Sequence, residues 1–110
     1  MQLRKYRWSR AYESAEEELE KMLAHKKIKA ERWTAEGDQS FAPHSHAHDK
    51  QLWCAEGSIV FTVNGQRFTL QSGDALDLPA NTIHDAIAGF SGCALYEAPP
   101  AASNPSIPAA

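Results

Sequence analysis

Three of the five histidines in the chain, His44, His46 and His48, occupy alternate positions. In an extended segment, side chains two residues apart point to the same side of the backbone. We therefore expect these three imidazoles to project together into the space that this side covers. Neutral imidazole is a common metal ligand. The pattern predicts one part of a metal site, and His84, in a separate segment, is the candidate for a further ligand.

A set of imidazole ligands defines the class of metal. Neutral imidazoles completed by water suit zinc, iron, nickel, manganese or copper, so the expected cofactor is a divalent transition-metal ion whose identity stays open. Such an ion polarises a carbonyl group, activates water or binds oxygen. The other interpretation is that the histidines form a hydrogen-bonded polar core or lie in an exposed loop.

The segments around these histidines have the pattern of an all-β domain. Turn-forming residues separate short apolar runs, as in a β-sandwich or β-barrel. The predicted strands are residues 28–34, 52–55, 58–63, 66–70, 75–78, 84–88 and 93–97. Asn64 and Gly65 are the strongest hairpin signal, because both residues tolerate positive φ. A loop is predicted from Gly89 to Gly92. The charged strand at 28–34 is expected at a sheet edge.

One helix is predicted before the first of these strands. Ser14 and Glu17 have the spacing of a capping box, which predicts a helix from about Ala15 to His25 or Lys27. His25 falls in the last turn, where a cation has a favourable contact with the helix dipole. It is therefore not counted among the metal ligands.

The length of 110 residues suits one domain with one core. Residues 1–27 are predicted to form an arm and helix that pack on a barrel, and residues 28–98 to form the barrel itself. Residues 99–110 contain four prolines and are predicted to be a flexible tail.

The net charge of −3 does not favour nucleic acid as a partner. Residues 1–32 carry nine Lys and Arg against six Asp and Glu. This excess fits a solvated helix face better than a phosphate-binding surface. No signal-peptide pattern or membrane span is visible, so a cytoplasmic location is expected. In that compartment, Cys54 and Cys93 are predicted to be buried thiols without a disulfide.

The order and spacing of several residues resemble the two motifs of the cupin family. The first motif has a glycine, two histidines one residue apart, and a later glycine. The second has a glycine, a proline and a histidine. The matching positions here are Gly37, His44, His46 and Gly57, then Gly73, Pro79 and His84. Asn81 stands where the family has a glycine, and Asn also adopts left-handed backbone.

The resemblance covers residues 30–97 and implies a single-domain cupin. Its fold would be a jelly-roll barrel, a double-stranded antiparallel β-helix, with one N-terminal helix and a metal ion inside. The resemblance also implies a homodimer and a small-molecule ligand. Trp53, Phe61, Phe68 and Tyr96 are then barrel core or pocket lining. Asp77 and Asp85 are expected to be turn or surface carboxylates.

Two positions depart from the family pattern. Lys50 stands where the family has a glutamate, and Ala88 stands where it has a late polar residue. The missing carboxylate leaves three possibilities for the ligand set: His48 replaces it, the amide of Gln51 replaces it, or three histidines suffice. By the two-residue period, Lys50 points inward and pairs with an anionic group, or its ammonium extends to the barrel mouth.

Two functions remain open at this point. The first is a metal-dependent cupin that binds or transforms a small molecule, by oxygenase, isomerase or decarboxylase chemistry. The alternative is a non-enzymatic module that binds or senses a small ligand, which the missing glutamate favours. The fold alone does not choose between them.

Overall fold

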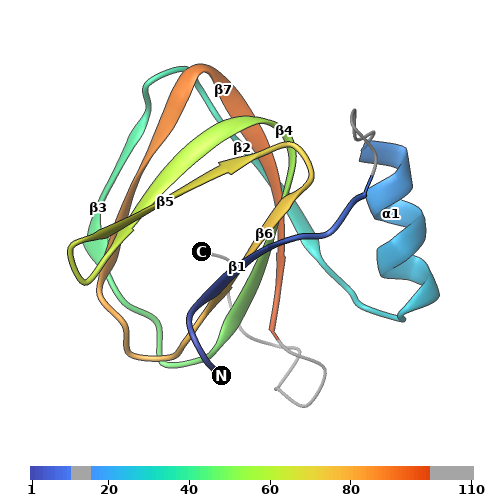
Figure 1. Ribbon diagram of the computed structural model, residues 1–110, viewed down its shortest axis with the longest axis horizontal. Helices are drawn as coiled ribbons and strands as arrows, with labels where there is room; N and C mark the ends of the chain where they lie inside the picture. Colours follow the sequence, from blue (N-terminus) through green and yellow to red (C-terminus); the bar gives the residue numbers. More distant parts are fainter. Residues whose placement is uncertain (11–15, 100–110) are drawn as a thin grey trace.

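The computed structural model describes residues 1–10 and 16–99, which form a curved antiparallel β-sheet with one helix outside it (Figure 1). The elements are β1 (Arg4–Arg7), α1 (Glu16–His25), β2 (Glu31–Ala35), β3 (Ser40–His44), β4 (Lys50–Val63), β5 (Gln66–Gln71), β6 (Asp74–Leu78) and β7 (His84–Ala98). The sheet runs β1-β6-β4-β7-β2, with β3 also paired to β7 and β5 to β4. The expected all-β jelly-roll barrel with one helix is confirmed.

Two long strands, β4 and β7, form the centre of the barrel. They pair antiparallel from Gln51 opposite Ala98 to Val63 opposite His84. The sequence predicted two short strands in each of these segments, and the structure joins each pair into one. The loop predicted from Gly89 to Gly92 is therefore wrong, because β7 continues through it as a bent strand.

The bends in β4 and β7 lie beside each other. Gly57 has φ 70° and Gly92 has φ 76°, and the strand register shifts on both sides of Gly57. A Cβ at Gly57 would lie 2.0 Å from the carbonyl oxygen of Gly92. The bend therefore requires glycine for its backbone angle and for this close approach.

Each bend changes which residues of the strand face the barrel core. In β4 the core residues are even-numbered before the bend and odd-numbered after it: Leu52 and Cys54, then Ile59, Phe61 and Val63. In β7 the core residues are Ala86 and Ala88, then Cys93 and Leu95. One register shift is enough to exchange the two faces of a strand, because side chains alternate with a period of two.

A second apolar cluster lies between α1 and the outer face of the sheet. Leu19 and Leu23 are the buried residues of the helix, and they pack with Trp53 and Tyr96. The helix ends at His25, as predicted, and His25 is exposed. The capping box at Ser14 lies outside the described residues.

The N-terminal arm adds a strand that the sequence did not predict. β1 pairs with β6, from Arg4 opposite Asp77 to Arg7 opposite Asp74. Both aspartates are buried, and each forms ion pairs with β1. Asp77 also accepts a hydrogen bond of 3.1 Å from the hydroxyl of Tyr6. The expectation that Asp77 is a turn or surface carboxylate is therefore wrong, since its burial is balanced by the charge of Arg4 and by the Tyr6 hydrogen bond.

The two cysteines are buried and form no disulfide, as predicted. Burial raises the pKa of Cys54 to about 12, so its thiol stays protonated and unreactive at neutral pH. The hairpin is also confirmed: Asn64 has φ 52° and Gly65 has φ 80°.

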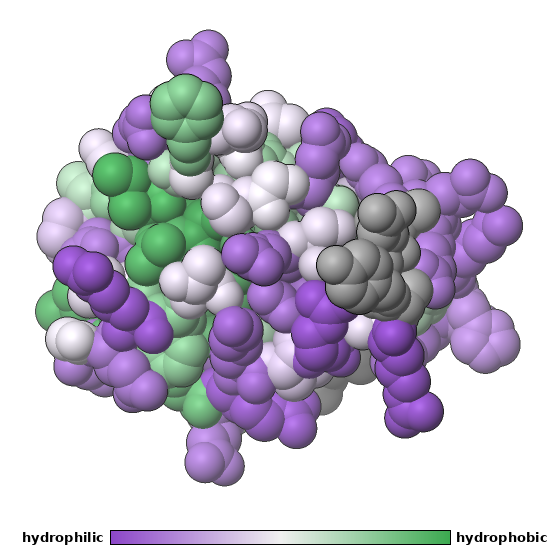
Figure 2. Space-filling view, turned by 45° about the horizontal axis from the view of Figure 1, so that its top comes forward, coloured by the Kyte–Doolittle hydropathy of each residue, from purple (hydrophilic) through white to green (hydrophobic). Residues whose placement is uncertain are grey.

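The surface has an apolar region on the barrel side. Figure 2 shows apolar side chains gathered over the barrel, away from the hydrophilic surface around α1. The large exposed apolar residues of the described chain are Met1, Ile83, Ile87 and Phe90. The helix in the described part of the chain is too short and polar to cross a membrane.

We predict that Gly57→Ala destabilises the fold by about 3 kcal/mol, because it adds a clash with Gly92 to a left-handed backbone. Gly65→Ala is the matched control. Gly65 also has positive φ, but a Cβ there would meet nothing within 4 Å. The control should lose only about 1 kcal/mol. Urea denaturation measures both free energies of unfolding, and equal losses would contradict the close approach at Gly57.

Candidate metal centre

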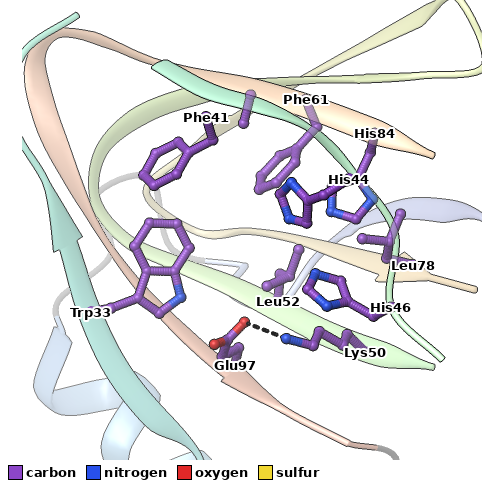
Figure 3. A pocket seen from close by; sticks show the side chains of 11 residues that line it. Trp33, Phe41, His44, His46, Lys50, Leu52, Phe61, Leu78, His84 and Glu97 are labelled. Atoms are coloured by element: carbon purple, nitrogen blue, oxygen red, sulfur yellow. Dashed lines mark hydrogen bonds and ion pairs between the residues drawn. The ribbon is translucent and has the colours of Figure 1, made fainter. Parts of the chain in front are cut away.

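Three histidines from two separate segments meet inside the barrel. One ring nitrogen from each of His44, His46 and His84 lies within 4.8 Å of the others. The ring centroids are 4.4 Å apart for His44 and His84, 4.8 Å for His44 and His46, and 5.3 Å for His46 and His84. Figure 3 shows the three rings directed toward one another at one end of a pocket.

Strand pairing places two of these histidines. His44 ends β3 and lies directly opposite His84, the first residue of β7. His46 follows β3 in a loop, and a hydrogen bond from a residue of the second motif holds this loop in place. The backbone N–H of Asn81 donates a 2.6 Å hydrogen bond to the carbonyl oxygen of His46. Asn81 has φ 58°, the left-handed conformation expected at this position.

His48 does not join the cluster. The expected extended segment from His44 to His48 is wrong, because β3 ends at His44 and the chain then turns. Asp49, just beyond it, accepts a 2.8 Å hydrogen bond from the backbone N–H of Ala80, which holds the loop against the Pro79 turn. His48 is exposed and lies outside the group of three.

Hydrogen bonds to backbone carbonyls fix the tautomers of two rings. The Nδ1 of His44 lies 2.7 Å from the carbonyl oxygen of Ala42, and the Nδ1 of His84 lies 2.9 Å from that of Thr82. A carbonyl oxygen only accepts, so each Nδ1 carries the proton and donates it. Nε2 of both rings then has a free lone pair, the arrangement that metal-binding histidines adopt.

The surroundings keep two of these histidines, His46 and His84, uncharged. Burial, followed by the positive charge of Lys50 and the neighbouring histidines, lowers the pKa of His46 to about 4. Burial is also the largest cause of the lowered pKa of His84, with His44 and Lys50 acting in the same direction. His46 and His84 are therefore neutral at pH 7, as metal ligands must be.

This donor set fits a divalent transition-metal ion. The three rings converge, two present Nε2, and two have lowered pKa values, so an ion would not have to displace protons from His46 or His84 at neutral pH. His44, His46 and His84 would hold the ion, and coordination positions away from the three rings would be left for water or a ligand.

The histidines form one end of a pocket with a volume of about 60 Å³. The remaining lining is mostly apolar: Trp33, Phe41, Lys50, Leu52, Phe61, Leu78, Ala86 and Glu97 complete it (Figure 3). Phe61 lines the pocket, whereas Trp53 and Tyr96 belong to the cluster beneath α1. Phe68 packs partly buried against the barrel core.

Lys50 and Glu97 form an ion pair in the same pocket. Their side chains are about 4–5% exposed, and Lys50 Nζ lies 3.5 Å from Glu97 Oε2. Lys50 therefore points inward and pairs with an anionic group, which is Glu97. Gln51 points to the opposite face, where its amide lies 3.5 Å from Asp77.

Sequence reasoning missed Glu97 and Trp33. Both side chains lie on the face of the β2–β7 pair that carries Leu95. Trp33 lies opposite Leu95, and Glu97 follows Leu95 by two residues. The alternation of Cys93, Leu95 and Glu97 was the available signal. It did not predict an inward carboxylate, since a charged residue at a strand end is ordinarily solvent-exposed.

Comparisons with known proteins agree with this architecture. The Cupin_2 family, described as "Cupin domain", matches residues 32–94. Quercetin 2,3-dioxygenase from Bacillus subtilis is 35% identical over 48 residues, which are 44% of this chain. The matched segment spans 14% of the length of that enzyme.

Solved structures share the fold. A cupin-2 domain containing protein from Shewanella frigidimarina has 26% identity and a TM-score of 0.56, over 64% of this chain and 68% of that one. A DUF861 family protein from Thermotoga maritima has 13% identity and a TM-score of 0.65, over 89% and 99% of the two chains. Salicylate 1,2-dioxygenase from Pseudoaminobacter salicylatoxidans has 16% identity and a TM-score of 0.56, over 64% and 19%. From the family match over residues 32–94, the chain belongs to the cupin domain family.

Proposed function

We propose that this chain is a metal-binding cupin that takes a small molecule at a three-histidine centre inside its barrel. The observation that carries the proposal is the convergence of His44, His46 and His84 at one end of an apolar pocket. Two of these rings present Nε2, since their Nδ1 atoms donate to backbone carbonyls. We assign no ligand role to His48, which is exposed.

The protein side of the pocket holds and orients the ligand in this proposal. Phe41, Phe61 and Leu52 exclude water from the space beside the histidines. A bound ion supplies Lewis-acid or oxygen chemistry at this position. Lys50 lies beside His46 and forms a charge pair with Glu97, so in this proposal neither takes the place of the family glutamate as a ligand (Figure 3).

Among the reactions open to such a site, we favour oxygenation. The similar segment of quercetin 2,3-dioxygenase supports this choice, although it spans a small part of that enzyme. A panel of small acids, diols and thiols, incubated with metal-loaded protein under oxygen, tests it. Oxygen consumption that depends on substrate and metal would support an enzyme.

A non-enzymatic binding module is the second candidate. The observation that favours it is the pairing of Glu97, the carboxylate of the pocket, with Lys50. This contact directs the carboxylate toward the ammonium of Lys50 instead of toward a bound ligand. Binding without turnover across the same panel would support this function.

The homodimer and the cytoplasmic location are also proposals. Light scattering after size-exclusion chromatography tests the homodimer.

We predict that His84→Ala removes the metal. Protein purified without a metal-affinity column should carry about one transition-metal ion per chain, and the variant less than about a tenth of that. His48→Ala is the matched control and should retain the ion. Elemental analysis measures the content, and circular dichroism confirms that the variants fold. Full retention of metal by His84→Ala would rule out the proposed centre.

The Lys50–Glu97 pair yields a second prediction. Two single variants should lose similar stability but change metal affinity in opposite directions. Lys50→Met and Glu97→Gln should each destabilise the fold by about 3 kcal/mol, because each leaves one buried charge without its partner. Their effects on metal affinity should be opposite. Lys50→Met removes a positive charge near the ion and should tighten binding about tenfold, whereas Glu97→Gln should weaken it by a similar factor.

Zinc titration against a fluorescent chelator measures these affinities. The double variant Lys50→Met/Glu97→Leu should recover most of the lost stability, since it removes both charges together. Changes in metal affinity of the same sign in the two single variants would contradict an electrostatic role for the pair.

A further inference from the structure

One buried polar atom of the pocket has no hydrogen-bond partner among the described residues. The indole Nε1 of Trp33 is a buried donor that forms no hydrogen bond within the described residues. The ring lines the pocket and packs edge-on against Phe41, at 5.6 Å between centroids. Figure 3 shows Nε1 on the side of the ring that faces Leu52 and Glu97. Buried N–H groups are rarely left without an acceptor, so this donor points to a ligand atom.

The charge inside the pocket indicates what the ligand carries. Three neutral imidazole ligands would leave both positive charges of a divalent ion uncompensated. In the family pattern, the carboxylate of the glutamate would compensate one of these charges. Lys50 adds no net charge, because Glu97 lies 3.5 Å from its ammonium. A ligand with an anionic oxygen at the metal end therefore balances the site better than a neutral one.

The end near Trp33 requires a different oxygen. Trp33 and Glu97 lie on the same inward face of β2 and β7, so a second anionic group beside the indole would meet the carboxylate of Glu97. A neutral carbonyl oxygen accepts the N–H without that repulsion. The pocket as a whole is small, at about 60 Å³, and its lining is mostly apolar, so a short ligand fits it better than a long one.

We propose that the pocket takes a short-chain oxo acid, with its carboxylate at the histidine centre and its keto oxygen accepting a hydrogen bond from Trp33. This inference rests on the proposed metal-binding function and specifies its ligand class. Trp33 is then the residue that selects a keto oxygen, and Phe41 holds the ring in position.

Nuclear magnetic resonance of zinc-loaded, ¹⁵N-labelled protein tests the contact directly. The chain has three tryptophans, so its spectrum has three indole N–H signals, and loss of one in Trp33→Phe identifies that of Trp33. Acetoacetate is the probe, and butyrate, of the same length and charge, lacks the keto oxygen. With acetoacetate the Trp33 signal should move downfield, and with butyrate it should move much less.

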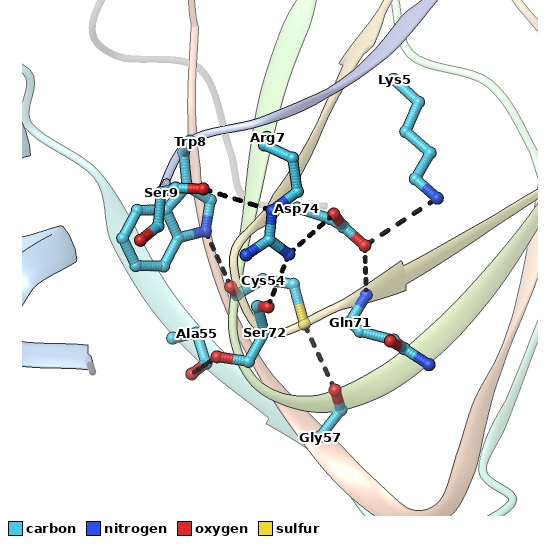
Figure 4. Close-up of polar contacts among 10 residues, drawn as sticks. All are labelled: Lys5, Arg7, Trp8, Ser9, Cys54, Ala55, Gly57, Gln71, Ser72 and Asp74. Atoms are coloured by element: carbon cyan, nitrogen blue, oxygen red, sulfur yellow. Dashed lines mark hydrogen bonds and ion pairs between the residues drawn. The ribbon is translucent and has the colours of Figure 1, made fainter. Parts of the chain in front are cut away.

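Trp8 provides the internal control. Its Nε1 already donates a 2.9 Å hydrogen bond to the carbonyl oxygen of Cys54, outside the barrel pocket (Figure 4). The Trp8 signal should therefore stay in place with either acid. Movement of all three indole signals together would indicate a general change in the protein and would overturn the inference.

Affinity provides the second measurement. Trp33→Phe keeps an aromatic ring but removes the donor, so it should weaken acetoacetate binding about fivefold, weaken butyrate binding much less, and leave zinc content unchanged. An equal loss for both acids would assign Trp33 to packing alone and overturn the keto contact. If the variant fails to fold, triple-resonance assignment identifies the Trp33 signal and its shift decides.

The outcomes separate the two proposals. Failure of wild-type protein to bind zinc overturns the proposed metal centre and this inference with it. Zinc binding with no response of Trp33 to saturating acetoacetate, or with no acetoacetate binding, overturns the oxo-acid inference alone.

Discussion

The close approach of Gly57 and Gly92 is the constraint on which the rest of the structure depends. The two longest strands, β4 and β7, bend at the same place, and a Cβ on Gly57 would lie 2.0 Å from the carbonyl oxygen of Gly92. With a larger residue in place of Gly57, the two strands would have to separate or straighten. Because both strands bend, β4 and β7 stay paired along the whole barrel. Straight strands would form two separate sheets joined by loops.

The bends also decide which polar groups enter the pocket. His84 faces inward together with the even-numbered residues that begin β7. If the same parity continued along the strand, Tyr96 would face the barrel and Glu97 would face α1. The change of parity at Gly92 reverses this: Tyr96 packs in the helix cluster, and Glu97 is buried beside Lys50. The bend therefore places Glu97, and with it the ion pair, in the same pocket as the histidine centre.

The sequence predicted the local features and, through the spacing of its motifs, the family. The hairpin at Asn64 and the helix ending at His25 depend on neighbouring residues, so they were visible. Glu97 was not, because its burial depends on a parity change and on a partner 47 positions away. His48 was placed with the other histidines because alternation assumes an extended chain, whereas the chain leaves the strand at His44. The β1 strand was missed because its charged side chains pair with buried aspartates of β6.

The exchange of the family's glutamate for Lys50 changes where negative charge lies in the barrel. In the family pattern a carboxylate lies among the ligands, next to the ion. Here the pocket carboxylate is Glu97, and the ammonium of Lys50 neutralises it. Burial is the largest cause of the lowered pKa of His46, and the charge of Lys50 is the next, because it disfavours a proton on that ring. A centre of neutral imidazoles near a neutralised pair takes its missing negative charge most readily from the ligand. In the proposed metal centre, the exchange of glutamate for Lys50 thus favours an anionic ligand at the positions that the histidines would leave open.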